Sequence, residues 1–303
     1  MTLPPISLVV PSLNQGRFLA ATLESVLGQA YPSLELLVHD GGSTDGTREV
    51  LESYRGRVDA VSEPDGGQAD AINRGLARAR GEVLGYLNSD DLLLPGALEA
   101  VGRAFAESAA LKLVYGRAVY VDEEGRTIGP CLTEEWSRER LADYCFVAQP
   151  AAFFRRSLLE EVGAFDARLH HALDYDFWLR AAERFAADEV LYLDRPLAAC
   201  RLHAGAKTVA GWDRALGEIF AVVRRRTGYL SLWWCLAKWD HRLDGRSQAT
   251  EPHPVPWIAY PPALAEFAIR NRFRPRALAR GLRGAPRAVL ARLRARRPRG
   301  AGG

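Results

Sequence analysis

Apolar positions in the first 110 residues alternate between two spacings, one typical of buried strands and one typical of amphipathic helices. Short runs rich in Val, Leu and Ile predict strands at 6–10, 34–38, 58–61 and 83–87. Apolar residues three and four positions apart predict helices at 17–29, 43–54 (with its cap), 67–79 and 95–107. Strand and helix alternate four times, which predicts an α/β fold with a mostly parallel sheet and helices on both faces.

The pattern changes after residue 110. Residues 113–121 alternate in the manner of a strand at a sheet edge, and Glu123-Glu124-Gly125 predicts a hairpin turn. Five prolines between Thr250 and Pro262 predict a linker or wrapping segment. Further strands are expected at 151–154, 190–193 and 196–202, and further helices at 174–184 and 210–227. We therefore expect three parts: a first half of the main domain at 1–110, a second half of the same domain at 111–228 and a C-terminal extension at 229–303.

The composition is that of a globular protein. Hydrophobic residues make up 48% of the 303 residues and charged residues 25%. No apolar run is as long as a membrane-spanning helix requires, and the first residues do not resemble a secretion signal. The cysteines lie far apart in the sequence, which favours reduced thiols in a cytoplasmic protein: Cys131, Cys145, Cys200 and Cys235.

Charge is distributed unevenly. The formal net charge is +3, yet residues 270–303 contain 12 arginines and no Asp, Glu or Lys. The remaining 269 residues carry 28 basic against 37 acidic residues, a net charge of −9. An acidic body with a basic tail predicts that the tail meets an anionic surface.

The basic tail also carries an apolar stripe. At 100° per residue, Leu278, Leu282, Val289 and Leu293 lie on one side of a helix that Pro286 interrupts. Such a helix can lie on an anionic membrane from the cytoplasmic side. The alternative is that the stripe packs on the catalytic domain or on a second subunit of a homodimer. Nucleic acid is not expected as a partner, because the rest of the chain is acidic, and the residues from about 297 onward are expected to be disordered.

Polar residues and glycines follow each of the first four predicted strands. Because ligands of an open parallel sheet bind beyond the carboxyl ends of its strands, these segments should surround one crevice. One such segment alone is better explained as a turn with capping residues, but four at one edge predict a binding site. The segments are Pro11-Ser12-Leu13-Asn14, Asp40 to Thr47, Glu63 to Gln68, and Asn88-Ser89-Asp90-Asp91.

Asp90 and Asp91 are the most informative pair. Adjacent carboxylates raise each other's pKa unless a cation lies nearby, and carboxylate oxygens suit Mg²⁺ or Mn²⁺, which can also bind a diphosphate. The sequence lacks the Lys-Ser/Thr phosphate loop and the Gly-x-Gly-x-x-Gly motif, which argues against a nucleotide triphosphatase and a dinucleotide dehydrogenase.

Taken together, these motifs resemble the family-2 glycosyltransferases, inverting enzymes with a GT-A fold. The resemblance covers about residues 5–210 in the family's order. Besides the four segments above it rests on Gln149-Pro150, Gly163 to Asp166, Leu173 to Arg180, Arg201-Leu-His203 and Lys207-Thr208.

The resemblance implies that residues 1–110 form the nucleotide-sugar-binding half and residues 111–228 the acceptor-side half of the domain. It implies a donor site for a nucleotide diphosphate sugar, usually a UDP-sugar. Asp40 matches the aspartate that contacts the base. The other residues implied at the donor nucleotide are Pro11, Ser12, Asn14, Asp65, Gln68, Asn88 and Asp90.

The resemblance also implies a Mn²⁺ or Mg²⁺ cofactor. Asp91 matches the main metal ligand, with Asp90 and His203 near the metal and diphosphate, and Asn88 replaces the first aspartate of the family's Asp-x-Asp motif. Contacts to the diphosphate or the acceptor are implied for Arg201, Lys207, Gln149 and Trp178.

For the catalytic base the resemblance points to Asp174, where Leu173 replaces the usual Glu, and it leaves Asp174 and Asp176 as alternatives. Asp174 opens a predicted helix, whose positive end would favour the ionised carboxylate. Its alternative role is a helix cap. Trp178 could be a platform for a sugar or simply part of the core, and the pair at 170–171 is interpreted as loop.

The expected function is metal-dependent inverting transfer of a sugar to a hydroxyl of a sugar or lipid-linked acceptor, in surface polysaccharide or glycolipid assembly. A sugar-nucleotide-forming nucleotidyltransferase is one alternative, but its glycine-rich basic loop is not found after the first strand. A non-catalytic nucleotide-sugar binder is another, but such a protein would be expected to lose the carboxylates that are present here.

Overall fold

The computed structural model describes residues 2–207, 211–244 and 259–282. These residues form two compact units, each built from two stretches of the chain. Within the described part of the chain, no helix is both long and apolar enough to cross a membrane. The first unit comprises Met1–Trp136 and Phe146–His203, and the second comprises Ser137–Cys145 and Ala204–Gly303.

The described strands of the first unit form one mixed sheet in the order β3-β2-β1-β4-β8-β6-β9-β5, with β7 paired to β6. The first four strands in this order are parallel, and the antiparallel pairs β4–β8, β8–β6, β9–β5 and β6–β7 lie in the other half. The mostly parallel sheet predicted for residues 1–110 is therefore confirmed. The strands are β1 (Ile6–Ser12), β2 (Leu34–Asp40), β3 (Asp59–Ser62), β4 (Val83–Tyr86), β5 (Leu92–Leu93), β6 (Leu113–Val121), β7 (Thr127–Pro130), β8 (Ala152–Arg155) and β9 (Val190–Arg201).

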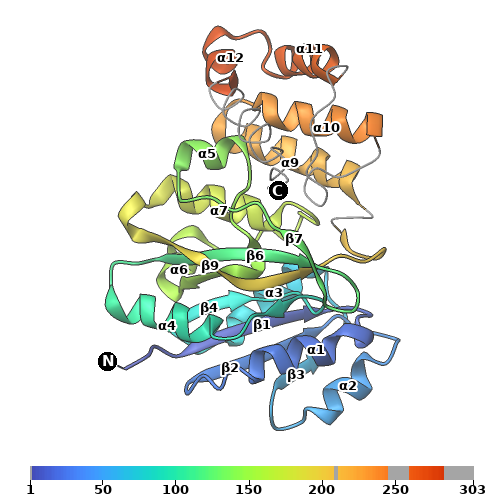
Figure 1. The fold of residues 1–303 in the computed structure, drawn as a ribbon, viewed down its shortest axis with the longest axis vertical. Coiled ribbons are helices and arrows are strands. Elements are labelled where there is room, and N and C mark those ends of the chain that lie inside the picture. The colour runs from blue at the N-terminus through green and yellow to red at the C-terminus, as the bar shows by residue number, and fades with distance from the viewer. Residues whose placement is uncertain (1, 208–210, 245–258, 283–303) are drawn as a thin grey trace, which may run out of the picture. The chain divides into compact units, whose positions relative to one another are not determined.

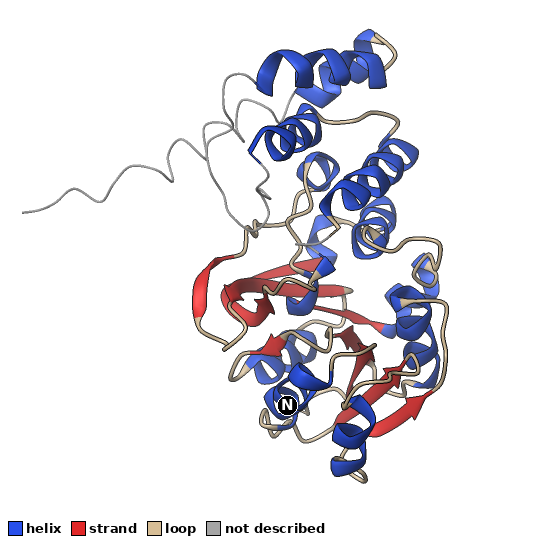
Figure 2. Ribbon diagram, turned by 90° about the vertical axis from the view of Figure 1, so that its right-hand side faces the viewer, coloured by secondary structure: helices blue, strands red, loops and turns tan. Residues whose placement is uncertain are grey.

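Helices cover both faces of the sheet (Figures 1 and 2). Leu8 and Val10 of β1 belong to the core that α1 (Gly16–Leu27) and α4 (Ala97–Glu107) cover. Val9 points to the opposite face, as strand alternation requires, and there meets α3 (Gln68–Arg78). A Cβ atom at Gly75 of α3 would lie 2.4 Å from Val9 Cγ1, so only glycine allows this close helix–strand contact.

The remaining described helices of the first unit are short except for α7, which has 12 residues. The two-turn helix α6 was not predicted from the sequence, because a segment of this length shows too little periodicity. These elements are α2 (Thr47–Ser53), α6 (Arg156–Val162), α7 (Leu173–Arg184) and the 3₁₀ turns η1 (Gln149–Ala151) and η2 (Ala187–Glu189).

Two expectations for the second half of the sheet are wrong. β6 is an interior strand between β8 and β9, with a fully buried start at residues 113–115, and is not at the sheet edge. The segments 190–193 and 196–202 form one strand, β9, because its pairing with β6 continues after Gly116–Leu193 directly at Arg117–Pro196. The two residues before Pro196 form a bulge at a position where proline cannot donate a ladder hydrogen bond.

The described part of the second unit is helical. Asn271 links two of its segments: its Oδ1 accepts from Leu230 N at 2.9 Å, and its Nδ2 donates to Leu230 O at 3.0 Å. This pairing satisfies both backbone groups of Leu230, which is 1% exposed. The helices are α5 (Arg138–Asp143), α9 (Trp212–Thr227), α10 (Leu232–Asp244), α11 (Tyr260–Arg270) and α12 (Pro275–Leu282).

The C-terminal predictions are only partly testable. The expected linker ends earlier than predicted, since α11 begins at Tyr260 and contains two prolines in its first turn, where proline is compatible with a helix. The start of the expected tail helix falls within α12, but Val289, Leu293, Pro286 and the residues from 297 onward lie outside the described residues.

None of the four cysteines, all of which lie in the described ranges, forms a disulfide. Cys131 and Cys200, which are 69 positions apart in sequence, nevertheless lie with their sulfur atoms 3.7 Å apart. The register of the sheet causes this approach, since Cys131 follows β7 and Cys200 belongs to β9, and both strands pair with β6.

Candidate active site

The carboxyl ends of β1, β2, β3 and β4 lie together at one edge of the sheet. Ser12 is in register with Asp40, and Asp40 with Ser62, so the last residues of three neighbouring strands lie side by side. The four polar segments singled out in the sequence therefore follow strands that end at the same edge. This arrangement is the one in which open parallel sheets bind ligands.

Asp40 is fully buried at this edge and accepts three hydrogen bonds. The Ser43 N–H donates to it at 3.1 Å, the Ser43 hydroxyl also donates to it, and the Ser62 hydroxyl donates at 2.6 Å. All three donors are neutral groups, and they satisfy the hydrogen-bonding capacity of a buried carboxyl group. Asp40 is thus a fixed acceptor at the end of β2.

The segment after β1 is connected to the one after β2. Asn14 has a φ of 53° and its Oδ1 accepts from the Thr44 N–H at 2.9 Å, while its own N–H donates to Ser43 Oγ at 2.7 Å. Asparagine is one of the residues that adopts this left-handed conformation most readily. Beside it, the Ser12 hydroxyl oxygen is buried and has no hydrogen-bond partner in the structure.

Asp65 is held close to the end of β2 by the absence of a side chain at Gly41. A Cβ atom at position 41 would lie 2.8 Å from Asp65 Oδ2. The Gly67 N–H donates to Asp65 Oδ1 at 2.8 Å, and His39 Nε2 lies 3.8 Å from Oδ2. The Asp65 carboxylate therefore has a defined position, with an ion-pairing partner only when His39 is protonated.

A chain of amide side chains connects the segment after β3 to the one after β4. Gln68 Nε2 donates to Asn88 Oδ1 at 2.6 Å, and Asn88 Nδ2 donates to Asp91 Oδ2 at 3.1 Å and to Gln149 Oε1 at 3.3 Å. Gln149 in turn donates to the Tyr86 carbonyl at 2.6 Å. Asn88 thus contacts Asp91 through its amide and orients that carboxylate.

Asp91 is buried, with 6% of its surface exposed. Its carboxylate accepts from two neutral donors, the Arg201 backbone N–H at 3.0 Å and Asn88 Nδ2. Burial, and then the neighbouring Asp90 carboxylate, raise the pKa of Asp91 well above its ordinary value of 3.8. A group in this environment gains from a nearby cation.

Asp90 belongs to a different chain of contacts. His203 Nε2 lies 3.0 Å from Asp90 Oδ2, and His203 Nδ1 lies 3.1 Å from an Arg17 guanidinium nitrogen. Arg17 also pairs with Glu123 at 3.2 Å. Because arginine can only donate, Nδ1 must accept, and the imidazole proton is on Nε2, from which it is donated to Asp90.

Neither Arg17 nor Glu123 was expected at this site. The two are 106 positions apart in sequence. Arg17 lies at the start of α1 and Glu123 in the turn between β6 and β7, so only the fold brings them together. The Phe18 ring lies between two arginines: the guanidinium carbon of Arg17 is 4.2 Å from the ring centroid, and that of Arg201 is 4.9 Å from it.

Arg201 is buried, and its guanidinium group binds backbone carbonyl groups of the loops next to β5 and β6. Its guanidinium donates to the carbonyl oxygens of Asp90 at 2.9 Å, Asp122 at 3.1 Å and Glu123 at 2.6 Å. Lys207, also expected near the diphosphate, is exposed and belongs to the second unit. The three hydrogen bonds of Arg201 to carbonyl oxygens give this residue a structural role, in which its charged donors hold the loops together.

Trp178 is 1% exposed and packs between aromatic rings. Its ring centroid lies 5.2 Å from that of Phe177 and 6.3 Å from that of Phe154. In this position the indole fills the core beneath α7, which is the second of the two roles considered for it. Tyr175, in the first turn of the same helix, is also buried.

Asp174 and Asp176, both in the first turn of α7, have different environments. Asp176 is fully buried and forms an ion pair with Arg180 at 2.8 Å. Asp174 is partly exposed and accepts from the Tyr175 N–H at 2.7 Å. Burial raises the pKa of Asp174 to about 6, and the backbone N–H groups only partly oppose this.

His170, interpreted from the sequence as loop, lies beside the segment that follows β3. Its Nδ1 would be 3.8 Å from a Cβ atom placed at Gly67, which has a φ of 110°. The segment before α7 therefore approaches the segment before α3, so the helix that carries Asp174 is near the loop that carries Asp65. No pattern in the sequence predicted this approach.

The carboxylate groups that follow β4 are compatible with binding of a divalent cation. Asp90 and Asp91 supply carboxylate oxygens, and Asp91 is buried with only neutral hydrogen-bond donors. Within the described ranges, no group of three or more His, Cys, Asp and Glu side chains is arranged to hold a metal ion. Two carboxylates fit the common arrangement in which Mg²⁺ takes its other ligands from a diphosphate and water.

Known proteins with similar structures share this fold. The chain aligns with residues 1–349 of S. aureus TarS, solved with UDP-GlcNAc, with a TM-score of 0.61 and 18% identity over 95% of this chain and 88% of that chain. It also aligns with the mannosyltransferase PcManGT from Pyrobaculum calidifontis, solved with GDP-Man and Mn²⁺, with a TM-score of 0.53 and 20% identity over 97% and 80% of the two chains. At this identity the likeness establishes the GT-A fold alone.

Sequence comparison identifies the family. A chondroitin synthase of Pasteurella multocida (strain Pm70) is 31% identical over 185 residues, which are 60% of this chain and 19% of that protein. The chain thus spans about a fifth of the length of this relative. The model of the family described as glycosyl transferase family 2 matches residues 7–163, more than half of the chain. The chain belongs to glycosyl transferase family 2.

Proposed function

We propose that this protein is a metal-dependent inverting glycosyltransferase that moves a sugar from a nucleotide diphosphate sugar to a hydroxyl group. The observation that carries the proposal is the position of Asp90 and Asp91 at the end of β4, at the sheet edge where Asp40 ends β2. A carboxylate pair at the sheet edge where ligands bind can hold a cation that stabilises a diphosphate leaving group.

We assign the donor nucleotide to the segments after β1, β2 and β3. Asp40 and Asp65 present fixed carboxylates there, and the buried Ser12 hydroxyl has an unused hydrogen-bonding capacity. These groups can accept from a base or ribose and donate to it. A UDP-sugar is the proposed donor; TarS was solved with UDP-GlcNAc, whereas PcManGT was solved with GDP-Man.

We assign the general base to Asp174. In an inverting transfer, the acceptor oxygen attacks the anomeric carbon as the bond from that carbon to the diphosphate oxygen breaks, and the electron pair leaves with the nucleotide diphosphate. The acceptor proton passes to the base. Asp174 is partly exposed and has a pKa of about 6, so it is ionised at neutral pH and basic enough to take a proton. Asp176 is already neutralised by Arg180 and fully buried.

Asp91, with Asp90 and His203 beside it, is the proposed metal site. Bound Mn²⁺ or Mg²⁺ supplies positive charge that stabilises the departing diphosphate. Asn88 and the Arg201 N–H orient the Asp91 carboxylate, and His203 orients Asp90. Gln68 and Gln149 contribute by fixing Asn88.

The proposed acceptor is a sugar or a lipid-linked sugar in surface polysaccharide or glycolipid assembly, at the cytoplasmic face of the membrane. The sequence relatives that include a chondroitin synthase support the polysaccharide class. The basic C-terminal residues would bring the protein to an anionic membrane surface.

The test is release of nucleoside diphosphate from a panel of UDP- and GDP-sugars with Mn²⁺, comparing the wild type with Asp91→Asn and Asp174→Asn. Donor-dependent release that both substitutions abolish supports the proposal. Formation of a sugar nucleotide from a nucleoside triphosphate and a sugar phosphate would instead establish a nucleotidyltransferase. Donor binding without turnover over a broad acceptor panel would indicate a binding protein.

A further inference from the structure

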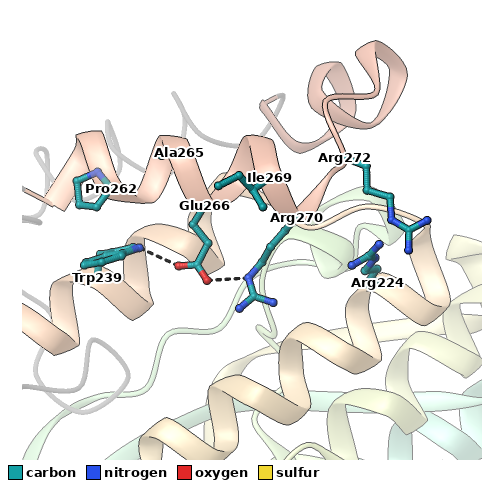
Figure 3. Close-up of a pocket in the computed structure, with 8 residues that line it drawn as sticks. All are labelled: Arg224, Trp239, Pro262, Ala265, Glu266, Ile269, Arg270 and Arg272. Carbon is teal, nitrogen blue, oxygen red and sulfur yellow. Dashed lines mark hydrogen bonds and ion pairs between the residues drawn. The ribbon is translucent and has the colours of Figure 1, made fainter.

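A pocket in the second unit, separate from the residues assigned above, is lined mainly by positive and apolar side chains (Figure 3). Its volume is about 580 Å³. It lies among α9, α10 and α11 and the turn that follows α11. The lining residues are Arg224, Trp239, Pro262, Ala265, Glu266, Ile269, Arg270 and Arg272.

The one carboxylate of the pocket is already neutralised. Glu266 accepts from Lys238 at 2.5 Å, from Arg270 Nε at 2.7 Å and from Trp239 Nε1 at 2.8 Å. Although burial opposes it, these donors lower the pKa of Glu266. Glu266 therefore has no remaining charge to offer to other arginines of the pocket.

Two further guanidinium groups remain without a carboxylate. Figure 3 shows the Arg224 and Arg272 guanidinium groups pointing toward one another on one side of the pocket. Among the residues that the structure describes, neither forms an ion pair. Two like charges that face each other repel, and an anion between them would remove that repulsion. Arginine forks match the oxygens of a phosphate group in particular.

One apolar side chain that lines the pocket, and one that follows the lining in sequence, are exposed to solvent. Ile269 is 62% exposed, and Phe273, which follows Arg272, is 68% exposed. Arg272 and Phe273 have φ values of 53° and 50°, so two consecutive non-glycine residues adopt the left-handed conformation. Such a conformation costs energy, and it directs this turn so that a large apolar side chain remains in water.

We infer that this pocket binds a phosphate group carried by an apolar body, with Arg224 and Arg272 contacting the phosphate oxygens. The apolar part would cover Ile269 and Trp239, and the negative charge would offset the excess of arginine. The ligand is either a soluble phosphorylated compound or the headgroup of a phospholipid, since both present the same chemistry. This inference does not depend on the proposed sugar transfer.

The test uses the full chain and two pairs of substitutions. The pocket pair is Arg224→Gln with Arg272→Gln. The control pair, Arg214→Gln with Arg280→Gln, removes the same charge from exposed residues of the second unit outside the pocket. The probes are inorganic phosphate and phenyl phosphate, measured by calorimetry in EDTA, and vesicles of phosphatidylcholine with or without phosphatidic acid, measured by co-sedimentation.

Wild type and control pair should bind one of these probes, and the pocket pair should bind it about tenfold or more weakly, because charge-assisted hydrogen bonds are lost. Binding of phenyl phosphate alone, weakened in the pocket pair, assigns a soluble ligand. Binding of phosphatidic-acid vesicles assigns a lipid headgroup if the pocket pair weakens it and the control pair does not. Equal vesicle binding by all three proteins, without binding of the soluble probes, would be due to other basic residues and would overturn the inference. An Arg272→Lys variant should bind with intermediate affinity, since lysine keeps the charge but not the fork.

Equal loss in both pairs, or no binding of any probe by the wild type, would overturn the inference. Binding of short DNA that the pocket pair abolishes, without binding of phosphate compounds or vesicles, would also overturn it in favour of nucleic acid. Mn²⁺-dependent UDP binding should be the same in the pocket pair as in the wild type, so failure of this inference can be distinguished from failure of the proposed donor site.

Discussion

His203 Nε2 donates a hydrogen bond to Asp90 Oδ2 at 3.0 Å, because Arg17 occupies the other imidazole nitrogen. The Asp90 carboxylate thus receives its orientation from a residue 113 positions later in the chain. Through Arg17, the same contacts reach Glu123 in the turn after β6. The orientation of a proposed metal-site carboxylate therefore depends on three separate segments.

The first prediction concerns Arg17 as an outer partner of the metal site. Arg17→Gln should weaken Mn²⁺-dependent UDP binding by about 10- to 100-fold, the usual effect of removing a partner that orients a ligand. Titration calorimetry of UDP with and without Mn²⁺ measures it. Arg103→Gln, which removes an exposed arginine paired only with Glu99, is the control and should bind as the wild type does.

The second prediction concerns Asp91. Mn²⁺ with UDP should raise the melting temperature of the wild type but not that of Asp91→Asn, because asparagine can still accept from the Arg201 N–H but offers no charge to a cation. Because Asp91 is buried, the conservative asparagine is preferred to alanine. An equal ligand-induced shift in both proteins would contradict the metal assignment.

The third prediction separates Asp174 from Asp176. Asp174→Asn should lower the transfer rate by about 10²- to 10⁴-fold with unchanged donor affinity, as removal of a general base does. Asp176→Asn should instead lower the free energy of unfolding by about 3–5 kcal/mol, because it leaves the Arg180 charge without its buried partner. Single-turnover rates and urea unfolding measure the two effects, and the opposite pattern would exchange the roles.

The fourth prediction is the pH dependence of transfer. The base must be ionised, and burial raises the pKa of Asp174 to about 6. The ratio kcat/KM should therefore fall below pH 6, approaching about tenfold per pH unit, and level off above pH 7. A flat profile between pH 5 and 7 would exclude Asp174 as the base. Asp143→Asn, which removes a carboxyl of similar pKa in the second unit, should leave the profile unchanged.

The fifth prediction concerns stability. Burial raises the pKa of Asp143 from 3.8 to about 6, so between these values the folded protein binds more protons than the unfolded chain and stability falls as pH rises. Asp143→Asn should raise the free energy of unfolding at pH 7.5, by up to about 3 kcal/mol, and should have little effect at pH 4. Asp213→Asn on an exposed position of α9 is the control.

Short sequence patterns correctly predicted much of the secondary structure of residues 1–110. The strands of residues 6–12, 34–40 and 83–86 are short and mostly buried, and their own apolar residues are enough to predict this burial. The polar residues that follow each strand are close to it in sequence. Their common edge follows from parallel topology. A strand and the polar residues that follow it can therefore be recognised from a segment of about ten residues.

Long-range contacts could not be predicted in this way. The ion pair of Arg17 with Glu123, the proximity of His170 to Gly67 and the contact of Cys131 with Cys200 depend on pairing between distant segments. The burial of Arg201 is a similar case, since its three carbonyl partners lie 78 to 111 positions away. A basic residue near an expected diphosphate site was a reasonable ligand, and only the fold reveals its other partners.

The pairing of Asn271 with Leu230 also has a consequence for chemical ageing. Its Nδ2 donates to the Leu230 and Phe267 carbonyls, and deamidation would replace this donor by a carboxylate oxygen facing both acceptors. Asn271 is 4% exposed, so the new charge would be buried, with the neutral Leu230 N–H as its donor. A stored sample that slowly acquires one extra negative charge at this residue should lose the stability of its C-terminal helices before the sheet is affected.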